Sequence, residues 1–369
     1  MHRKTDMGGG PRLQTEIVKV DQELSLDELM LNYNLIKGAS LIKKGDVVAI
    51  PTETVYGLAA DALNPTAARK IYRAKGRPSD NPLIVHVADM DHVLSLAAEV
   101  PEGAMKLAEK FWPGPLTMIF PKTDIVPYET TGGLDTVAVR MPKHNVALAM
   151  IKLSGGFLAA PSANASGKPS PTEARHVQED LNGRIPMIID SGSVGIGLES
   201  TIIDFSAGAP TILRPGYITK AMAEEVIGEI SVDGALIAVD SRNKPKAPGM
   251  KYRHYAPRAP LTVVMGESKA VVERINSIAD TASKSGKKVG VICSEETLLG
   301  YYADEIIPLG SKGDEITVAK NLFGVFRKMD ERGVDVIYSE AFESDGLGVA
   351  IMNRLLKAAG PNVIRLRKD

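Results

Sequence analysis

The stretch KGRPSDNPLIVHV, residues 75–87, joins the end of a predicted helix to a predicted strand. Asn64 is a favoured N-cap residue for this helix, and Gly76 can adopt the left-handed conformation that ends one. The apolar run PLIVHV that follows has the length and composition of a buried strand. The stretch therefore predicts a helix–strand unit of an α/β or α+β protein, with Lys75 and Arg77 at the junction.

The same alternation of patterns extends on both sides of this unit. The strand-type runs are DVVAIPT, PLIVHV, LTMIF, TVAVRMP, GGFLAAP, PMIID, STIIDF and TILRP. Helical patterns lie near 24–44, 65–75, 89–99, 103–111, 143–153, 173–181 and 219–228. Several strand-type runs between residues 185 and 214 follow one another without a helix, so we expect a mixed sheet.

The composition changes at SRNKPKAPGMKYRHYAPRAP, residues 241–260, which contains prolines and basic residues and no acidic residue. Such a segment predicts an extended linker. Strand-type runs and helical patterns near 268–284, 315–331 and 347–358 then alternate regularly, as in a small doubly wound, Rossmann-like α/β domain. The predicted organisation is a flexible extension (1–14), a sheet domain (15–240), the linker (241–260) and a C-terminal α/β domain (261–369).

Composition excludes several classes of protein. With 44% hydrophobic and 24% charged residues, the 369-residue chain is typical of globular proteins. It contains no apolar run near the ~20 residues of a membrane span and no secretory signal, so we expect a soluble protein without a membrane partner. The single cysteine, Cys293, excludes an internal disulfide and favours a cytoplasmic location. The net charge of −1 requires any anion site to be local.

Lys75 and Arg77 are candidates for a phosphate site. Gly76 and two nearby prolines constrain the backbone around them, which lowers the entropic cost of directing long side chains at one ligand. The alternative is a helix C-terminus that attracts cations, as it does in any protein. In TVAVRMP, alternation places Thr136 and Arg140 on one strand face among small residues, where a carboxylate or phosphate could bind. An edge-strand arginine directed to water is the alternative there.

The loop AAPSANASGKPSPT, residues 159–172, follows a strand-type run and contains Ser162 and Ser170. Small residues allow a ligand to approach the backbone closely, although ordinary turns use the same residue types. Ser200 and Arg214 stand beside two further strand-type runs. The ordinary role of His86, in PLIVHV, would be that of a buried histidine with satisfied hydrogen bonds.

These motifs together resemble one family, the L-threonylcarbamoyladenylate synthases of the YrdC/YwlC/Sua type. The matching segments are PTETVYGLAADA, KGRPSDNPLIVHV, FWPGPLT, TVAVRMP, APSANASGKPSPT, ESTIIDF and LRPG. They follow the family's order and spacing over roughly residues 20–235. PGMKYRHYAP and the C-terminal GLGVAIMNRLLKAA look like the two-domain Sua branch. The resemblance implies a YrdC-like, twisted, mixed open sheet with helices, followed by the smaller Rossmann-like domain.

The resemblance also implies an activity. L-Threonine, bicarbonate or CO2 and ATP would be joined into threonylcarbamoyl-AMP with release of pyrophosphate, by a nucleotidyltransferase that acts first in the threonylcarbamoyladenosine modification of tRNA. A separate transferase would then pass the threonylcarbamoyl group to tRNA. No covalent nucleophile is expected, and Mg²⁺ would be carried by the ATP phosphates and not by protein ligands.

Site residues are implied position by position. The threonine site would comprise Thr54, His86, Arg140, the Ala160 backbone and Ser200. The nucleotide site would comprise Lys75, Arg77, Asn81, Thr136, Ser162, Ser170, Arg214 and Met250, with Lys75 and Arg77 as cations on the phosphates. In the linker, Lys251, Tyr252, Arg253, His254 and Tyr255 would close the site; a plain spacer is the alternative.

Two other functions remain open at this point. The cations Lys70, Arg73, Lys75 and Arg77, with those of the linker, could form a groove for double-stranded RNA, so weak RNA binding is also expected. The near-neutral charge and the 5% aromatic content argue against RNA binding as the main function. A dinucleotide site at GLGVA, residues 346–350, lacks the third glycine of the usual motif.

Overall fold

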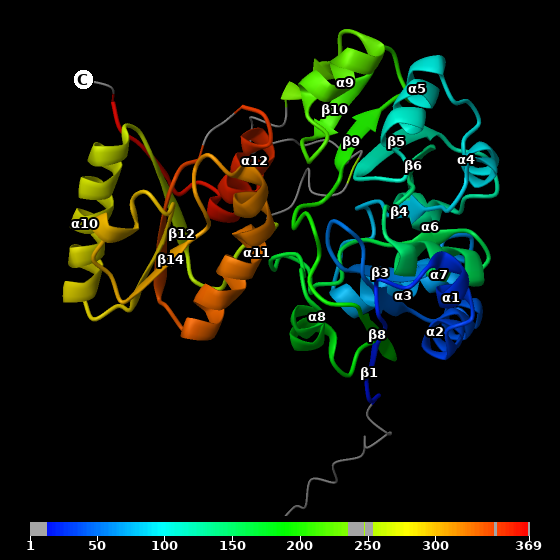
Figure 1. The fold of residues 1–369 in the computed structure, drawn as a ribbon, viewed down its shortest axis with the longest axis horizontal. Coiled ribbons are helices and arrows are strands. Elements are labelled where there is room, and N and C mark those ends of the chain that lie inside the picture. The colour runs from blue at the N-terminus through cyan, green and yellow to red at the C-terminus, as the bar shows by residue number, and fades with distance from the viewer. Residues whose placement is uncertain (1–12, 235–246, 248–253, 343–344, 368–369) are drawn as a thin grey trace, which may run out of the picture.

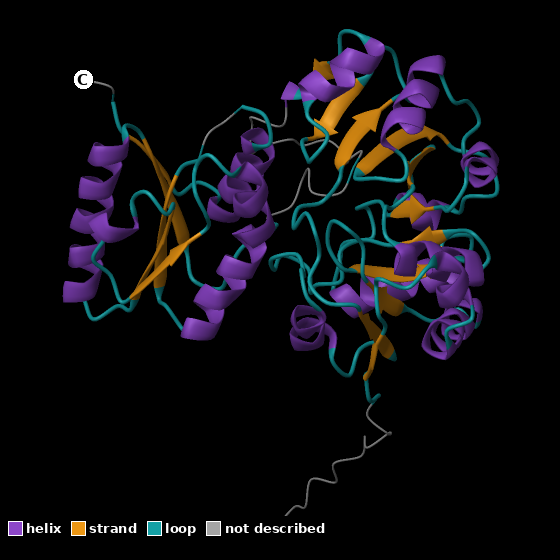
Figure 2. Ribbon diagram, in the orientation of Figure 1, coloured by secondary structure: helices purple, strands orange, loops and turns teal. Residues whose placement is uncertain are grey.

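The computed structural model describes residues 13–234, 247, 254–342 and 345–367, which form two β-sheets flanked by helices (Figure 1, Figure 2). The larger sheet has eleven strands in the order β1-β8-β2-β3-β7-β4-β6-β5-β9-β10-β11, and the smaller has five in the order β14-β13-β15-β12-β16. The predicted two-domain α/β architecture is confirmed. The exact domain limits stay predictions, because residues 1–12 and most of the linker lie outside the described residues.

The strands of the larger sheet are β1 (Glu16–Lys19), β2 (Val48–Ile50), β3 (Gly57–Asp61), β4 (Ile84–His86), β5 (Leu116–Pro121), β6 (Thr136–Arg140), β7 (Leu158–Ala159), β8 (Met187–Asp190), β9 (Thr201–Asp204), β10 (Thr211–Arg214) and β11 (Ser231–Val232). The pairing is mixed, as predicted: β4 runs parallel to β6, and β5 runs antiparallel to it. The strand-type runs did not include β3, whose sequence GLAAD lacks the β-branched and aromatic residues typical of strands.

The helices of the N-terminal domain are α1 (Leu26–Met30), α2 (Tyr33–Lys43), α3 (Pro65–Lys75), α4 (Met90–Leu96), α5 (Glu102–Phe111), α6 (Tyr128–Thr131), α7 (Asn145–Leu153), α8 (Ala174–Leu181) and α9 (Lys220–Ile227). The single helical pattern near 24–44 forms two helices. Ser25 caps α1 in a capping box, and Asn32 accepts hydrogen bonds from the backbone amides of Asn34 and Leu35 to begin α2. A second N-cap residue within the apolar pattern therefore ends one helix and begins another.

The C-terminal domain contains β12 (Leu261–Met265), α10 (Ser268–Lys284), β13 (Val289–Cys293), the 3₁₀ turn η2 (Leu298–Gly300), β14 (Glu305–Pro308), α11 (Glu315–Arg332), β15 (Val336–Glu340), α12 (Gly348–Ala359) and β16 (Val363–Arg365). All strand pairs of this sheet are parallel. Helix α10 covers one face, and α11 and α12 cover the face turned toward the N-terminal domain (Figure 1). Within the described ranges, none of the helices combines the length and apolar character needed to cross a bilayer.

The two domains share an apolar contact. Val55 and Leu198 of the N-terminal domain belong to the same buried cluster as Phe323 of α11. Tyr255, in the described part of the linker, packs against Phe323 with ring centroids 5.2 Å apart. Because Tyr255 also lines the pocket described next, the C-terminal domain supports part of that pocket wall.

Candidate active site

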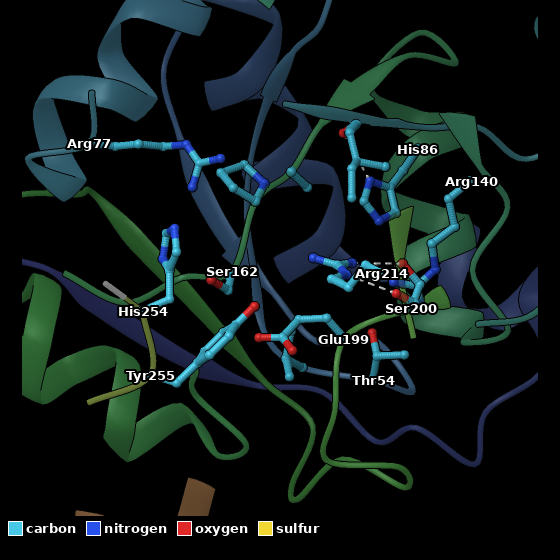
Figure 3. A pocket seen from close by; sticks show the side chains of 14 residues that line it. Thr54, Arg77, His86, Arg140, Ser162, Glu199, Ser200, Arg214, His254 and Tyr255 are labelled. Carbon is cyan, nitrogen blue, oxygen red and sulfur yellow. Dashed lines mark hydrogen bonds between the residues drawn. The ribbon is translucent and has the colours of Figure 1, made fainter. Parts of the chain in front are cut away.

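A pocket with about 500 Å³ of empty space brings together most of the predicted site residues (Figure 3). The predicted residues in its lining are Thr54, Arg77, His86, Arg140, Ala160, Ser162, Ser200, Arg214, His254 and Tyr255. Lys75, Asn81, Thr136 and Ser170 do not line it. Met250, Lys251, Tyr252 and Arg253 lie outside the described residues, so their predicted contacts and the closing role of the linker stay predictions.

Arg77 enters the pocket from the turn that ends α3. Gly76 has a φ of 63°, the left-handed conformation predicted for the helix end. Arg77 then donates hydrogen bonds to the Asn81 carbonyl oxygen (3.2 Å), Asn81 Oδ1 (2.6 Å) and the Pro82 carbonyl oxygen (3.0 Å). Burial lowers the pKa of Arg77 to about 10, so it stays charged at neutral pH. Asn81 therefore holds the pocket cation in place and does not itself line the pocket.

Lys75 does not line the pocket, and its side chain contacts the loop that contains Ser162. Its Nζ donates hydrogen bonds to the carbonyl oxygens of Ser162 and Asn164, the latter at 2.7 Å. Burial, followed by the positive charge of Arg77, lowers its pKa well below the usual value. In this arrangement Lys75 supports the small-residue loop, and its predicted contact with phosphate stays a prediction.

Arg140 and His86 lie opposite each other on the paired strands β6 and β4. Glu53 Oε2 is 2.7 Å from Arg140 Nη2, and both side chains are largely buried. Burial and the charge of Arg140 lower the pKa of His86 to about 3, so its imidazole is neutral at physiological pH. Thr136 lies at the other end of β6 from Arg140. Arg140 is thus a buried cation with one carboxylate partner already in place.

Ser200 and Arg214 are joined directly. Arg214 donates from Nε to the Ser200 carbonyl oxygen (3.0 Å) and from Nη2 to Ser200 Oγ (3.1 Å). Glu199, which sequence reasoning did not include, also lines the pocket. Its Oε1 accepts a hydrogen bond from Ser170 Oγ at 2.5 Å, so Ser170 is buried behind the lining. The acidic residue in GLESTIIDF, next to the predicted Ser200, was the available signal for this carboxylate.

The lining is positively charged. In the described part of the chain, Arg77, Arg140 and Arg214 contribute three positive charges and Glu199 one negative charge. Hydrogen bonds between arginine and an anionic ligand are strong in a partly buried site, because few waters compete for them. The arrangement is therefore suited to hold two anionic ligands close together.

Two family models match the chain: one described as "Telomere recombination" over residues 40–216, and one described as "Threonylcarbamoyl-AMP synthase, C-terminal domain" over residues 218–360. The threonylcarbamoyl-AMP synthase of Pyrococcus abyssi is 50% identical over 93% of this chain and 99% of its own length. The Bacillus subtilis enzyme of the same name is 50% identical over 92% of this chain and 97% of its own length. The chain belongs to the threonylcarbamoyl-AMP synthase family.

The chain is also similar in three-dimensional structure to a member of this family. The crystal structure of P. abyssi Sua5 complexed with L-threonine superposes with a TM-score of 0.89, is 49% identical, and covers 96% of this chain and 100% of its own. The predicted resemblance to the two-domain branch of this synthase family is confirmed.

Helix α3 does not present the unbroken basic face that the RNA-binding alternative requires. Arg69 pairs with Glu129 at 2.5 Å, and Lys70 pairs with Asp46 at 3.3 Å. Lys75 is buried. Cations that are paired or buried attract nucleic-acid phosphates less than exposed, unpaired ones do, so the synthase family is favoured over a groove for double-stranded RNA.

Three buried histidines predict a loss of stability in mild acid. Burial lowers the pKa of His86, His176 and His254 to about 3, whereas exposed histidines in the unfolded chain titrate near 6.5. Below pH ~6.5 the unfolded chain therefore binds more protons than the folded one, and stability falls as the pH falls. We expect the free energy of unfolding to drop by up to ~1.4 kcal/mol per pH unit for each histidine.

Urea unfolding at pH 7.5, 6.0 and 5.0 measures this loss. This pH range lies above the one in which Asp180 and Glu199 take up protons, because the pKa of each carboxyl group is lowered. Protonation of these two residues therefore does not contribute to the expected loss. The H176Q variant should show a shallower dependence on pH than the parent protein. Equal free energies of unfolding at pH 7.5 and 5.0 would show that these histidines already carry protons in the folded state.

Proposed function

We propose that this protein joins L-threonine, bicarbonate or CO2 and ATP into L-threonylcarbamoyl-AMP and releases pyrophosphate. The observation that carries the proposal is the pocket with Arg77, Arg140 and Arg214, in a chain 50% identical to named threonylcarbamoyl-AMP synthases. The protein would act as a nucleotidyltransferase in the first step of the threonylcarbamoyladenosine modification of tRNA. A separate transferase would use the product.

Threonine is proposed to bind at the Arg140 end of the pocket. Arg140 would donate to its carboxylate, and Thr54, the Ala160 backbone and Ser200 would supply polar contacts around it. His86 would contribute a neutral ring, since its pKa of about 3 keeps it from adding another positive charge. The support for this placement is that all five residues line one pocket.

ATP is proposed to bind at the Arg77 and Arg214 end, beside Ser162. In the reaction, the threonine amine adds to CO2 to form a carbamate and gives up a proton to water. A carbamate oxygen then attacks the α-phosphate, and the bond to pyrophosphate breaks. Both partners in this second step are anions, so the arginines lower the barrier by offsetting their repulsion. Holding the two in contact could contribute ~7–11 kcal/mol.

Mg²⁺ is proposed to arrive with ATP. Among the described residues, no group of three His, Cys, Asp or Glu side chains is placed to hold a metal ion. Glu199, the carboxylate in the described lining, is engaged by Ser170 and by Arg354 of α12. A magnesium ion at a triphosphate site is commonly held mainly by phosphate oxygens and water.

The test of the proposed function needs only purified protein. Incubation with ATP, Mg²⁺, L-threonine and bicarbonate, without RNA, should release pyrophosphate and give a nucleotide product with the mass of threonylcarbamoyl-AMP. Release should stop when threonine is omitted. Absence of pyrophosphate from protein that is folded and pure would refute the proposal.

Serine should be a weak substrate and valine a very poor one. Losing one methyl group from a bound substrate costs ~1–3 kcal/mol, so we expect kcat/KM for serine to be about 10–200-fold lower than for threonine. Valine leaves polar groups such as Thr54 and Ser200 without a hydroxyl partner, which gives stronger rejection. Pyrophosphate release with each amino acid measures the order. A kcat/KM for valine above that for serine would show that the pocket does not recognise the hydroxyl.

A further inference from the structure

Arg354 of α12 reaches from the C-terminal domain into the wall of the pocket. Its side chain is fully buried. Nε lies 3.1 Å from Glu199 Oε2, Nη2 donates to the Glu199 carbonyl oxygen (3.3 Å), and Nη1 donates to the Pro215 carbonyl oxygen (2.5 Å). All three contacts are made to the N-terminal domain, so Arg354 connects the two domains at this point.

The residues that Arg354 contacts are the chain neighbours of pocket residues. Glu199 precedes Ser200, and Pro215 follows Arg214. Because Arg214 itself donates to Ser200, the guanidinium of Arg354 holds both segments of one hydrogen-bonded pair. It also lies 5.9 Å from the ring centroid of Tyr255, a third segment of the lining.

A close backbone contact places the same loop independently of Arg354. Gly197, two residues before Glu199, has a φ of 84°, and a Cβ there would lie 2.5 Å from Lys320 Cα of α11 and 2.6 Å from the Lys320 carbonyl oxygen. Only glycine allows this approach without displacing the loop or the helix. The segment that contains Glu199 therefore contacts the C-terminal domain at two points, Lys320 of α11 and Arg354 of α12.

Glu199 pairs with Arg354 and shares the pocket lining with a second cation, Arg214. Its burial favours the neutral acid, but the positive charges of Arg354 and Arg214, together with hydrogen bonds such as that from Ser170, outweigh burial, so the pKa of Glu199 is below its usual value. Glu199 is therefore a buried anion, and a buried anion that loses one counter-ion is left with only the remaining cation to compensate its charge. Without Arg354, Glu199 would attract Arg214 at the expense of any phosphate bound there.

We propose that Arg354 is a positioning residue for the nucleotide site: it acts as the counter-ion of Glu199, limits how strongly that carboxylate attracts Arg214, and makes the C-terminal domain a working part of the site. The identity of the nucleotide, ATP, rests on the proposed function. Arg354 is not expected to touch substrate, so its effect should appear in ATP binding more than in the rate at saturation.

The test compares ATP binding by calorimetry, with Mg²⁺ and without threonine, across four full-length variants. R354Q removes the charge but keeps hydrogen-bond donors, and should raise the Kd for ATP about tenfold. The double variant R354Q/E199Q removes both charges, and should return the Kd to within about threefold of the parent. R354K keeps the charge but loses the planar fork of donors, so it should lose less affinity for ATP than R354Q does. E331Q removes the exposed interdomain pair of Glu331 with Arg175, far from the pocket lining, and should bind ATP like the parent.

A role confined to holding the domains together predicts a different pattern. The double variant would then bind ATP no better than R354Q, and either that result or an equal loss in R354K and R354Q would overturn the proposal. Pyrophosphate release should show a raised KM for ATP with kcat within about threefold in R354Q. If R354Q does not fold, as judged by circular dichroism, the double variant R354Q/E199Q decides: it must bind ATP within about threefold of the parent.

The proposal and the proposed function fail separately. A parent protein that binds ATP but releases no pyrophosphate with threonine and bicarbonate would refute the proposed function. The role of Arg354 would then still be tested by the ATP affinities of the variants. A parent protein that does not bind ATP would refute both.

Discussion

Replacing Arg140 with methionine should raise the KM for threonine by about 10²–10³-fold. The substitution removes the cation proposed to bind the threonine carboxylate. It also leaves Glu53, whose Oε2 lies 2.7 Å from Arg140 Nη2, as a largely buried carboxylate without that counter-ion. The remaining negative charge would repel the substrate carboxylate and destabilise the fold. Pyrophosphate release as a function of threonine concentration gives the KM, and urea unfolding gives the stability.

The double variant R140M/E53Q separates these two effects. Neutralising Glu53 should recover most of the lost free energy of unfolding, because the buried charge is gone. The KM for threonine should stay high, since no cation has been restored. Recovery of threonine affinity in the double variant would show that Arg140 serves only to balance Glu53 and does not bind the substrate.

The R77M variant should lower kcat by about 10²–10³-fold, the typical loss when one preorganised group that stabilises charge in the transition state is removed. Arg77 is held by the carbonyl oxygens of Asn81 and Pro82 and by Asn81 Oδ1, so its charge is in position before the nucleotide binds. A smaller rise in the KM for ATP should accompany the loss. The measurement is pyrophosphate release at saturating ATP and threonine.

Arg73 supplies the matched control. It lies on α3, four residues before Arg77, but is exposed and not part of the pocket lining. R73M changes the net charge of the protein by the same amount as R77M and should leave kcat unchanged. Equal losses in the two variants would mean that Arg77 acts through the general field of the protein and not through a contact with phosphate.

Local patterns predicted most of the fold. Strand-type runs such as PLIVHV and TVAVRMP correspond to β4 and β6, because β-branched residues pack well on the pleated surface of a sheet. The prediction of secondary structure was incomplete where strand pairing or a helix cap, and not hydrophobic periodicity, decided the local structure. The alanine-rich β3 is a strand because neighbouring strands hold it, and the helical pattern near 24–44 divides at the cap residue Asn32.

The sequence predicted which residues meet in the candidate site better than it predicted how their side chains are arranged. The motifs pointed to Arg77, Arg140 and Arg214, and the pocket contains all three. They did not indicate that Lys75 turns toward the carbonyl oxygens of Ser162 and Asn164. The direction of a long side chain depends on which acceptors lie within reach, and those acceptors come from a loop about ninety residues further along the chain.

The sequence by itself determined the family, the two-domain α/β architecture and most of the residue types that meet in the pocket, since these depend on periodicity and on short motifs. Tertiary structure alone decided how the charges are shared among them. Glu53 lies against Arg140, and Glu199 pairs with Arg354, a residue 155 positions away. Electrostatic interactions depend on distance and burial in space, and neither can be obtained from separation along the chain.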